Sequence, residues 1–177
     1  MKIDEVLNLL WDQYTAITPQ AKEVHNLLLS SGEEKIVNDH IAFRTIESKK
    51  IGMNILSSYF EVFGYKKSGE YYFEEKKVRA LHLENEQTDL PKIFISEIIP
   101  SQLSKFSQKI CDKIISRSPS DGLIFAGSPW DKTYSVYKKI YQESEYLAWV
   151  YLHGFVANHF TVSVNNLKNF NTLEEVN

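Results

Sequence analysis

Two histidines stand at equivalent places in two short stretches that alternate polar and apolar residues. Residues 38–46 read NDHIAFRTI and residues 157–165 read ANHFTVSVN, so His40 and His159 coincide when the stretches are aligned. Alternation with a period of two is typical of a strand with one face in the core. If the stretches open two copies of one module, their histidines would meet at a pseudo-two-fold axis, where they could share a metal ion.

The first stretch also carries an arginine on the same strand face. His40, Ala42 and Arg44 alternate with Ile41, Phe43 and Thr45, which form the apolar face. An imidazole supplies a nitrogen ligand, and a guanidinium grips a carboxylate through two N–H groups. This pattern favours a metal ligand beside an anchor for a substrate carboxylate. A strand that simply faces water would carry the same residues.

A carboxylate would complete a facial triad of the kind found in non-haem iron(II) enzymes. Glu97 lies in the apolar stretch 92–99 (KIFISEII), where a merely solvated carboxylate is unexpected. We predict Glu97 as a tentative third ligand, with a hydrogen bond to a histidine or a salt bridge to Arg44 as open alternatives. Residues that could line the site are His82, Thr161 and Ser163.

The elements that must position these residues suggest an α+β fold. Helical spacing covers 2–16, a second helix runs from Pro19 to Ser31-Gly32, and Ser48 is expected to cap a helix over 49–62. Extended patterns are the strand at 39–46 and segments 65–73 (with a turn at Ser68-Gly69), 78–84 and 92–99. Later helical patterns cover 101–116 and run from Ser128-Pro129 through Tyr141, before a strand at 157–164.

This order predicts four segments. They are an N-terminal helical segment 1–37, a first βαβββ module 38–100, a helical insertion 101–156, and the start of a second, apparently truncated module at 157–177. Truncation is expected because the second copy has its first strand and lacks the three that should follow.

Composition excludes several classes of protein. The 177 residues are 43% hydrophobic and 24% charged, with a net charge of −3, which argues against a nucleic-acid-binding surface. The single cysteine, Cys111, rules out an intrachain disulfide and a cysteine-rich zinc site. No apolar run is long enough for a membrane span, and no signal peptide is recognisable, so a soluble, cytoplasmic protein is expected. Neither a P-loop nor a Rossmann glycine pattern nor a G-x-S-x-G elbow is present.

Several of these segments resemble the 2-oxoadipate dioxygenase/decarboxylase family, whose members have a vicinal-oxygen-chelate-like fold. The resemblance rests on NDHIAFRT at 38–45, RALHLEN at 79–85, PKIFISEI at 91–98 and NHFT at 158–161. It implies an iron(II) enzyme that uses O2 to convert a 2-oxo acid into a 2-hydroxy acid one carbon shorter, with release of CO2.

The resemblance also implies roles for individual residues. His40 and His159 would be the first two metal ligands, and Arg44 would anchor a substrate carboxylate. The third family ligand, a glutamate in the last strand of the second module, has no counterpart here, so Glu97 could only be a substitute ligand or a partner of one. Two other functions stay open: a zinc- or manganese-dependent hydrolase or isomerase of the glyoxalase type, and a truncated relative that binds a ligand without turnover. The oligomeric state is not predicted.

Overall fold

A mixed five-stranded sheet forms the centre of the chain, with strand order β2-β3-β4-β1-β5. The structure is a computed structural model that describes residues 1–87, 89–170 and 172–176. Strand β1 runs parallel to β4 and antiparallel to β5, while β3 is antiparallel to both β2 and β4. The strands are β1 (Asn38–Ile46), β2 (Lys66–Phe73), β3 (Val78–Glu84), β4 (Lys92–Ile98) and β5 (Ala157–Val162). The predicted α+β class is confirmed.

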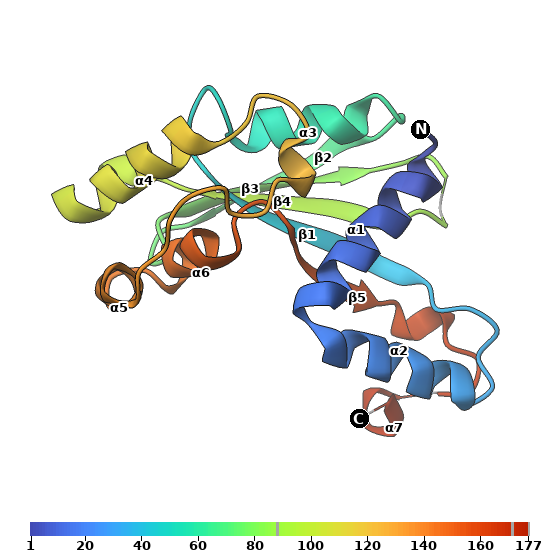
Figure 1. The fold of residues 1–177 in the computed structure, drawn as a ribbon. Helices are drawn as coiled ribbons and strands as arrows, with labels where there is room; N and C mark the ends of the chain where they lie inside the picture. The colour runs from blue at the N-terminus through green and yellow to red at the C-terminus, as the bar shows by residue number, and fades with distance from the viewer. Residues whose placement is uncertain (88, 171, 177) are drawn as a thin grey trace.

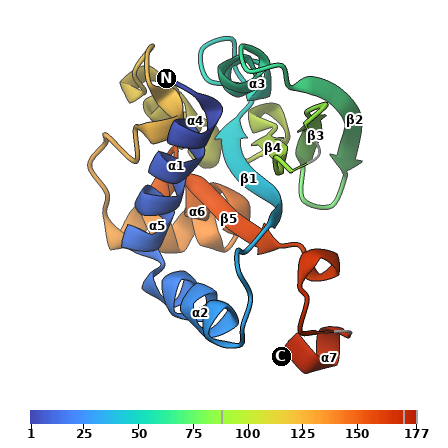
Figure 2. The same cartoon turned by 90° about the vertical axis from the view of Figure 1, so that its right-hand side faces the viewer.

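Helices cover both faces of this sheet. Figure 1 shows α3 and α4 on one side and α5 and α6 on the other, and in Figures 1 and 2 α2 and α7 lie at the lower end of the molecule. The α-helices are α1 (Ile3–Ile17), α2 (Pro19–Ser30), α3 (Met53–Glu61), α4 (Lys105–Arg117), α5 (Tyr134–Tyr141), α6 (Glu145–His153) and α7 (Leu173–Val176). Short 3-10 helices are formed by Pro100–Gln102, Leu123–Phe125 and Val164–Asn166. Among the described residues, no helix has both the length and the apolar character needed to cross a membrane.

The apolar face of β1 packs into the core, as its alternation predicts. Ile41 and Phe43 are fully buried, and the Phe43 ring lies 5.5 Å from the ring of Phe60 on α3. Helix α1 adds Val6 and Leu10 to the same core. The opposite face of β1, which carries His40 and Arg44, is therefore the one left for chemistry.

The helix predicted at 49–62 begins later than expected. The Ser48 hydroxyl accepts a hydrogen bond from the Ile51 N–H at 3.0 Å, which closes a turn rather than capping a helix. Helix α3 then begins at Met53, with Gly52 as its N-cap. A Cβ at position 52 would lie only 2.5 Å from the Ser48 carbonyl oxygen, so this tight turn requires glycine.

The helix predicted from Ser128 also begins later, at Tyr134, where Thr133 accepts a hydrogen bond from the Val136 N–H. Trp130 is buried and donates its indole N–H to the Tyr151 carbonyl at 2.8 Å, which ties the preceding segment to α6 instead. The predicted turn at Ser68-Gly69 is a register shift within one continuous strand, β2. In both places tertiary packing overrides the local signal.

A glycine sets the entry into β5. Gly154 ends α6 with φ of +69°, and a Cβ there would lie 1.9 Å from the Gly127 carbonyl oxygen. The two segments are joined by backbone hydrogen bonds between Gly127 and Phe155. This close approach fixes where β5 starts, and so fixes the position of His159 along β1.

Candidate functional site

The two histidines predicted from the aligned stretches meet across neighbouring strands. His40 lies on β1 and His159 on β5, opposite Ala42. Thr161 holds the strands together at this point, because its hydroxyl accepts the His40 N–H at 3.1 Å and donates to the His40 carbonyl at 2.8 Å. Thr161 therefore positions His40 through its backbone.

The Nε2 atoms of His40 and His159 lie 3.2 Å apart. Nitrogen ligands sit about 2.0–2.1 Å from a metal such as zinc, so two nitrogens at this separation subtend roughly 100° at a shared ion. That angle lies between the octahedral and tetrahedral values. The imidazole pair therefore fits two adjacent positions around one metal.

Each histidine is held at its other ring nitrogen. Asp39 places a carboxylate oxygen 2.8 Å from His40 Nδ1, and Asn158 places its side-chain amide 2.7 Å from His159 Nδ1. An Nδ1–H that donates to a carboxylate leaves the Nε2 lone pair free, as a metal ligand requires. For Asn158 the same tautomer needs the amide oxygen to face His159, which is a rotation of the amide about its own axis.

The surroundings of His159 favour its neutral imidazole form. Burial, then the neighbouring His40, then the charge of Arg44 all lower the pKa of His159. A neutral ring is the form that binds metal. The electrostatics of this face therefore agree with its geometry.

A hollow of about 460 Å³ opens in front of the histidines. Its lining residues are His40, Tyr71, His82, Lys92, Phe94 and His159. The His82 ring is parallel to that of Phe94, and its Nδ1 lies 3.0 Å from the Tyr71 hydroxyl. His82 is thus placed at the wall of the hollow, where the sequence suggested it.

Arg44 lies on the same face of β1, nearer to α6. Its guanidinium carbon is 5.1 Å from the Tyr146 ring centroid and 5.2 Å from that of Trp149. In the part of the chain that the structure describes, Arg44 has no ion pair or side-chain hydrogen bond, and burial lowers its pKa. A partly desolvated guanidinium that forms no ion pair keeps its N–H groups available for an incoming carboxylate.

Glu97 is not brought to the histidines. It is paired with Thr45 across the β1–β4 register, so its side chain projects from the core face of the sheet. There it accepts the Met53 N–H at 2.8 Å and pairs with Arg79 at 2.9 Å, rather than with Arg44. This geometry does not support Glu97 as a substitute metal ligand.

Ser163 also lies apart from the hollow, where its hydroxyl binds Asn166 in the turn that follows β5. Across the described residues, no group of three or more His, Cys, Asp or Glu side chains is arranged to hold a metal. The histidine pair therefore stands as two ligands without a third from residues 1–87, 89–170 or 172–176.

Sequence reasoning missed the residues that support the histidines. Asp39 and Asn158 each directly precede a histidine in the aligned stretches, and this shared acceptor position was a usable signal. Tyr71, Lys92 and Phe94 reach the hollow through strand pairing that no local pattern reveals.

Comparison with known proteins gives a consistent family. The sequence model described as 2-oxoadipate dioxygenase/decarboxylase matches residues 2–127. The chloroplastic 2-oxoadipate dioxygenase/decarboxylase of Arabidopsis thaliana is 32% identical over 97% of this chain and 52% of its own length. The chain thus spans about half the length of the curated relatives it matches.

Solved structures agree. A Shewanella frigidimarina protein provisionally described as a hydrolase is 38% identical, with a TM-score of 0.93 over 99% of this chain and 70% of that one. Hydroxyglutarate synthase from Oryza sativa, crystallised with 2-oxoadipate, is 33% identical, with a TM-score of 0.85 over 92% of this chain and 58% of that one. A glyoxalase-superfamily protein from Ralstonia eutropha shares the fold at 18% identity, with a TM-score of 0.74 over 87% and 60% of the two chains.

Proposed function

Because this chain belongs to the 2-oxoadipate dioxygenase/decarboxylase family, we propose that His40 and His159 hold the iron(II) of an enzyme acting on a small 2-oxo acid, 2-oxoadipate or a close analogue. The reaction consumes one O2, releases the substrate carboxyl group as CO2 and leaves a 2-hydroxy acid one carbon shorter. The observation that carries the proposal is the 3.2 Å separation of the Nε2 atoms of His40 and His159. Each ring is oriented by a contact at its other nitrogen, Nδ1.

A family of dioxygenases implies a metal, and the donor set here suits one. Two neutral imidazoles are ligands for iron, zinc or manganese sites alike, so the pair does not select the ion by itself. We choose iron(II) because oxygen chemistry requires a redox-active metal, and such a metal, when bound, supplies the place where O2 and the 2-oxo acid meet. His40 and His159 would hold the metal, together with a third ligand such as the glutamate that the family resemblance implies.

The chain's own residues bind and orient the substrate. Arg44 would grip the distal carboxylate of a 2-oxo dicarboxylic acid, since its guanidinium forms no ion pair in the described structure. Phe94 and Tyr71 add aromatic surface to the wall of the hollow, against which the carbon chain of the substrate would pack. Asp39 holds the proton on His40 Nδ1 and so keeps Nε2 directed at the metal.

Strand β5 is proposed as the first strand of a second module. Its antiparallel pairing with β1 supports this, because two modules related by a two-fold axis would place their first strands in this way. The divisions at 1–37, 38–100, 101–156 and 157–177 stay predictions. A cytoplasmic location also stays a prediction, since the Arabidopsis relative is chloroplastic.

A glyoxalase-type hydrolase or isomerase that uses zinc or manganese is the second candidate. The Shewanella relative's hydrolase description and the shared glyoxalase-superfamily fold favour it. A third candidate, a relative that binds its ligand without turnover, is favoured by the absence of a third metal ligand among the described residues.

One experiment separates these functions. Untagged protein is loaded anaerobically with iron(II), and metal content, O2 uptake and CO2 release from 2-oxoadipate are measured for wild type, His40→Ala and His159→Ala. We expect near-stoichiometric iron and coupled O2 and CO2 turnover in the wild type and in neither of these two variants, with His153→Ala retaining its metal as the control. Zinc or manganese binding without O2 uptake would favour the hydrolase, and a wild type that binds no metal would contradict the proposal.

A further inference from the structure

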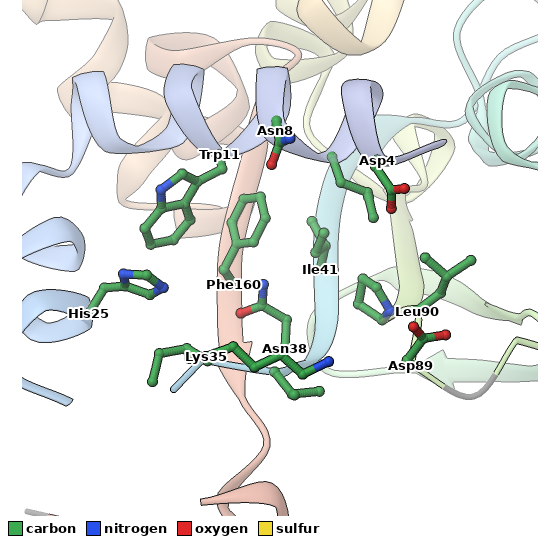
Figure 3. Close-up of a pocket in the computed structure, with 14 residues that line it drawn as sticks. Asp4, Asn8, Trp11, His25, Lys35, Asn38, Ile41, Asp89, Leu90 and Phe160 are labelled. Carbon is green, nitrogen blue, oxygen red and sulfur yellow. The ribbon is translucent and has the colours of Figure 1, made fainter. Parts of the chain in front are cut away.

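A second cavity lies on the other face of the same two strands. Ile41 and Phe160, which are paired between β1 and β5, point into it, whereas the neighbouring His40 and His159 point away. It has a volume of about 460 Å³, within the usual range of small-molecule sites. Helix α1 roofs it, α2 closes one side, and the loop before β4 closes the other (Figure 3).

One end of this cavity, which we call the α1 cavity because α1 covers it, is aromatic. The Trp11 ring centroid lies 5.2 Å from that of Phe160, in an edge-to-face arrangement, and 5.2 Å from that of His25. Burial lowers the pKa of His25, which favours the neutral form of this ring. Flat apolar groups pack well against such a wall.

The other end is acidic. Figure 3 shows Asp4 and Asp89 on the far side of Ile41 from Trp11 and Phe160. Among the described residues, neither carboxylate has an ion pair or accepts a side-chain hydrogen bond, and the one basic residue of the lining, Lys35, is likewise unpaired. Two carboxylates against one ammonium leave the lining with a net negative charge.

We propose that the α1 cavity binds a small organic monocation with a flat apolar body, of the arylalkylammonium class. The ring of the ligand packs against Trp11 and Phe160, and its ammonium group lies toward Asp4 and Asp89. The site is separate from the histidine hollow, and nothing in the proposed function requires it.

The charges of the lining make predictions of opposite sign. Removal of a carboxylate should lower the affinity for the cation, and removal of the Lys35 ammonium should raise it, each by a few-fold, as expected for exposed charges. Asp4 lies in the first turn of α1, where the helix dipole offsets part of its charge, so Asp89 should contribute the larger share.

The test is a calorimetric titration with 2-phenylethylammonium and with 3-phenylpropionate, an anion of similar shape. We expect saturable binding of the cation alone. The double variant Asp4→Asn/Asp89→Asn should weaken it about fivefold and Lys35→Gln should tighten it, while Asp12→Asn, an exposed charge on the same helix, should leave it unchanged. Trp11→Leu should weaken binding independently of charge.

Three outcomes would overturn the proposal: no binding of the cation, equal binding of the anion, or a cation affinity that is the same in the double variant and in Lys35→Gln. Thermal unfolding of each variant shows that it is folded before titration. His40→Ala should bind the cation like the wild type, so a failed metal site and a failed cation site are told apart.

Discussion

Strand β1 presents a core face with Ile41, Phe43 and Thr45 and a histidine face with His40, Ala42 and Arg44. On the core face, buried polar groups have partners within the fold: the Thr45 hydroxyl donates to the Ile51 carbonyl at 2.6 Å. The carboxylate of Glu97, which is 4% exposed, binds the Met53 N–H and Arg79 on that same face.

On the histidine face the polar side chains have binding groups that the fold itself does not use. The Nε2 atoms of His40 and His159 point at one another, and the Arg44 guanidinium lies near two aromatic rings and forms no ion pair in the described structure. Folding alone gives no reason to bury groups in this state, because unpaired polar groups are costly. The difference between the faces separates a charge that stabilises the fold from one that is available to a ligand.

The strongest test of this difference is His40→Gln. We expect metal affinity to fall by more than about 100-fold, because even partners outside the coordination sphere are worth 10–100-fold. Stability should not fall, since the ring makes no contact on which the core depends. Metal titration and urea unfolding measure the two effects. A variant that lost stability and kept its metal would show that His40 serves the fold rather than a metal site.

Arg44→Met should be the next largest effect. If the guanidinium anchors a carboxylate, kcat/KM for a 2-oxo dicarboxylic acid should fall by about 50-fold, the worth of a charge-assisted hydrogen-bond pair. The loss should be much smaller for a 2-oxo monocarboxylic acid of similar length. Thermal stability should be unchanged or raised, because a desolvated charge is removed. Equal losses with both substrates would count against the anchor role.

Glu97→Gln tests the opposite face. We expect a loss of about 2 kcal/mol of unfolding free energy, since a buried carboxylate that binds Arg79 and a helix N-terminal N–H becomes neutral. Part of the pair's strength is screened because the Arg79 side chain is 43% exposed. Metal binding should be unaffected. Glu47→Gln removes Arg79's more exposed partner and should cost less than about 1 kcal/mol, which makes it the matched control in urea unfolding.

Asp39→Ala sharpens the comparison within the histidine face. Metal affinity should fall about tenfold, the low end for a residue that orients a ligand, because the Asp39 side chain is 54% exposed. Asp39→Asn, whose amide oxygen can still accept from Nδ1, should recover part of this loss. Metal titration of both variants measures it, and identical affinities for Asp39→Ala and wild type would remove Asp39 from the site.

The sequence was informative where local periodicity and repetition applied. Alternation in β1 assigned its two faces, and the aligned histidines predicted a meeting that depends on strands more than a hundred residues apart. It misled for Glu97, because burial of a carboxylate was apparent while its partner was not: Arg79 lies on β3, and no spacing along the chain shows that β3 and β4 pair at this register. The place of Tyr146 and Trp149 over Arg44 was not predictable from the local sequence, since it depends on how α6 docks.

The smallest effect concerns Glu33, a buried carboxylate that serves the fold as Glu97 does. Its Oε1 accepts the N–H groups of Lys168 and Asn169, each at 2.8 Å, which ties the end of α2 to the segment after β5. These backbone hydrogen bonds hold its pKa below the usual value, so the contribution to stability is present above the unfolded pKa and lost as pH falls through the folded one. The protection factors of these two amides, which correct for the intrinsic pH dependence of exchange, should therefore fall several-fold on acidification in the wild type, and should be low and insensitive to this titration in Glu33→Gln. Metal binding at neutral pH should not respond to Glu33→Gln, because this carboxylate, like that of Glu97, already accepts hydrogen bonds from the chain itself.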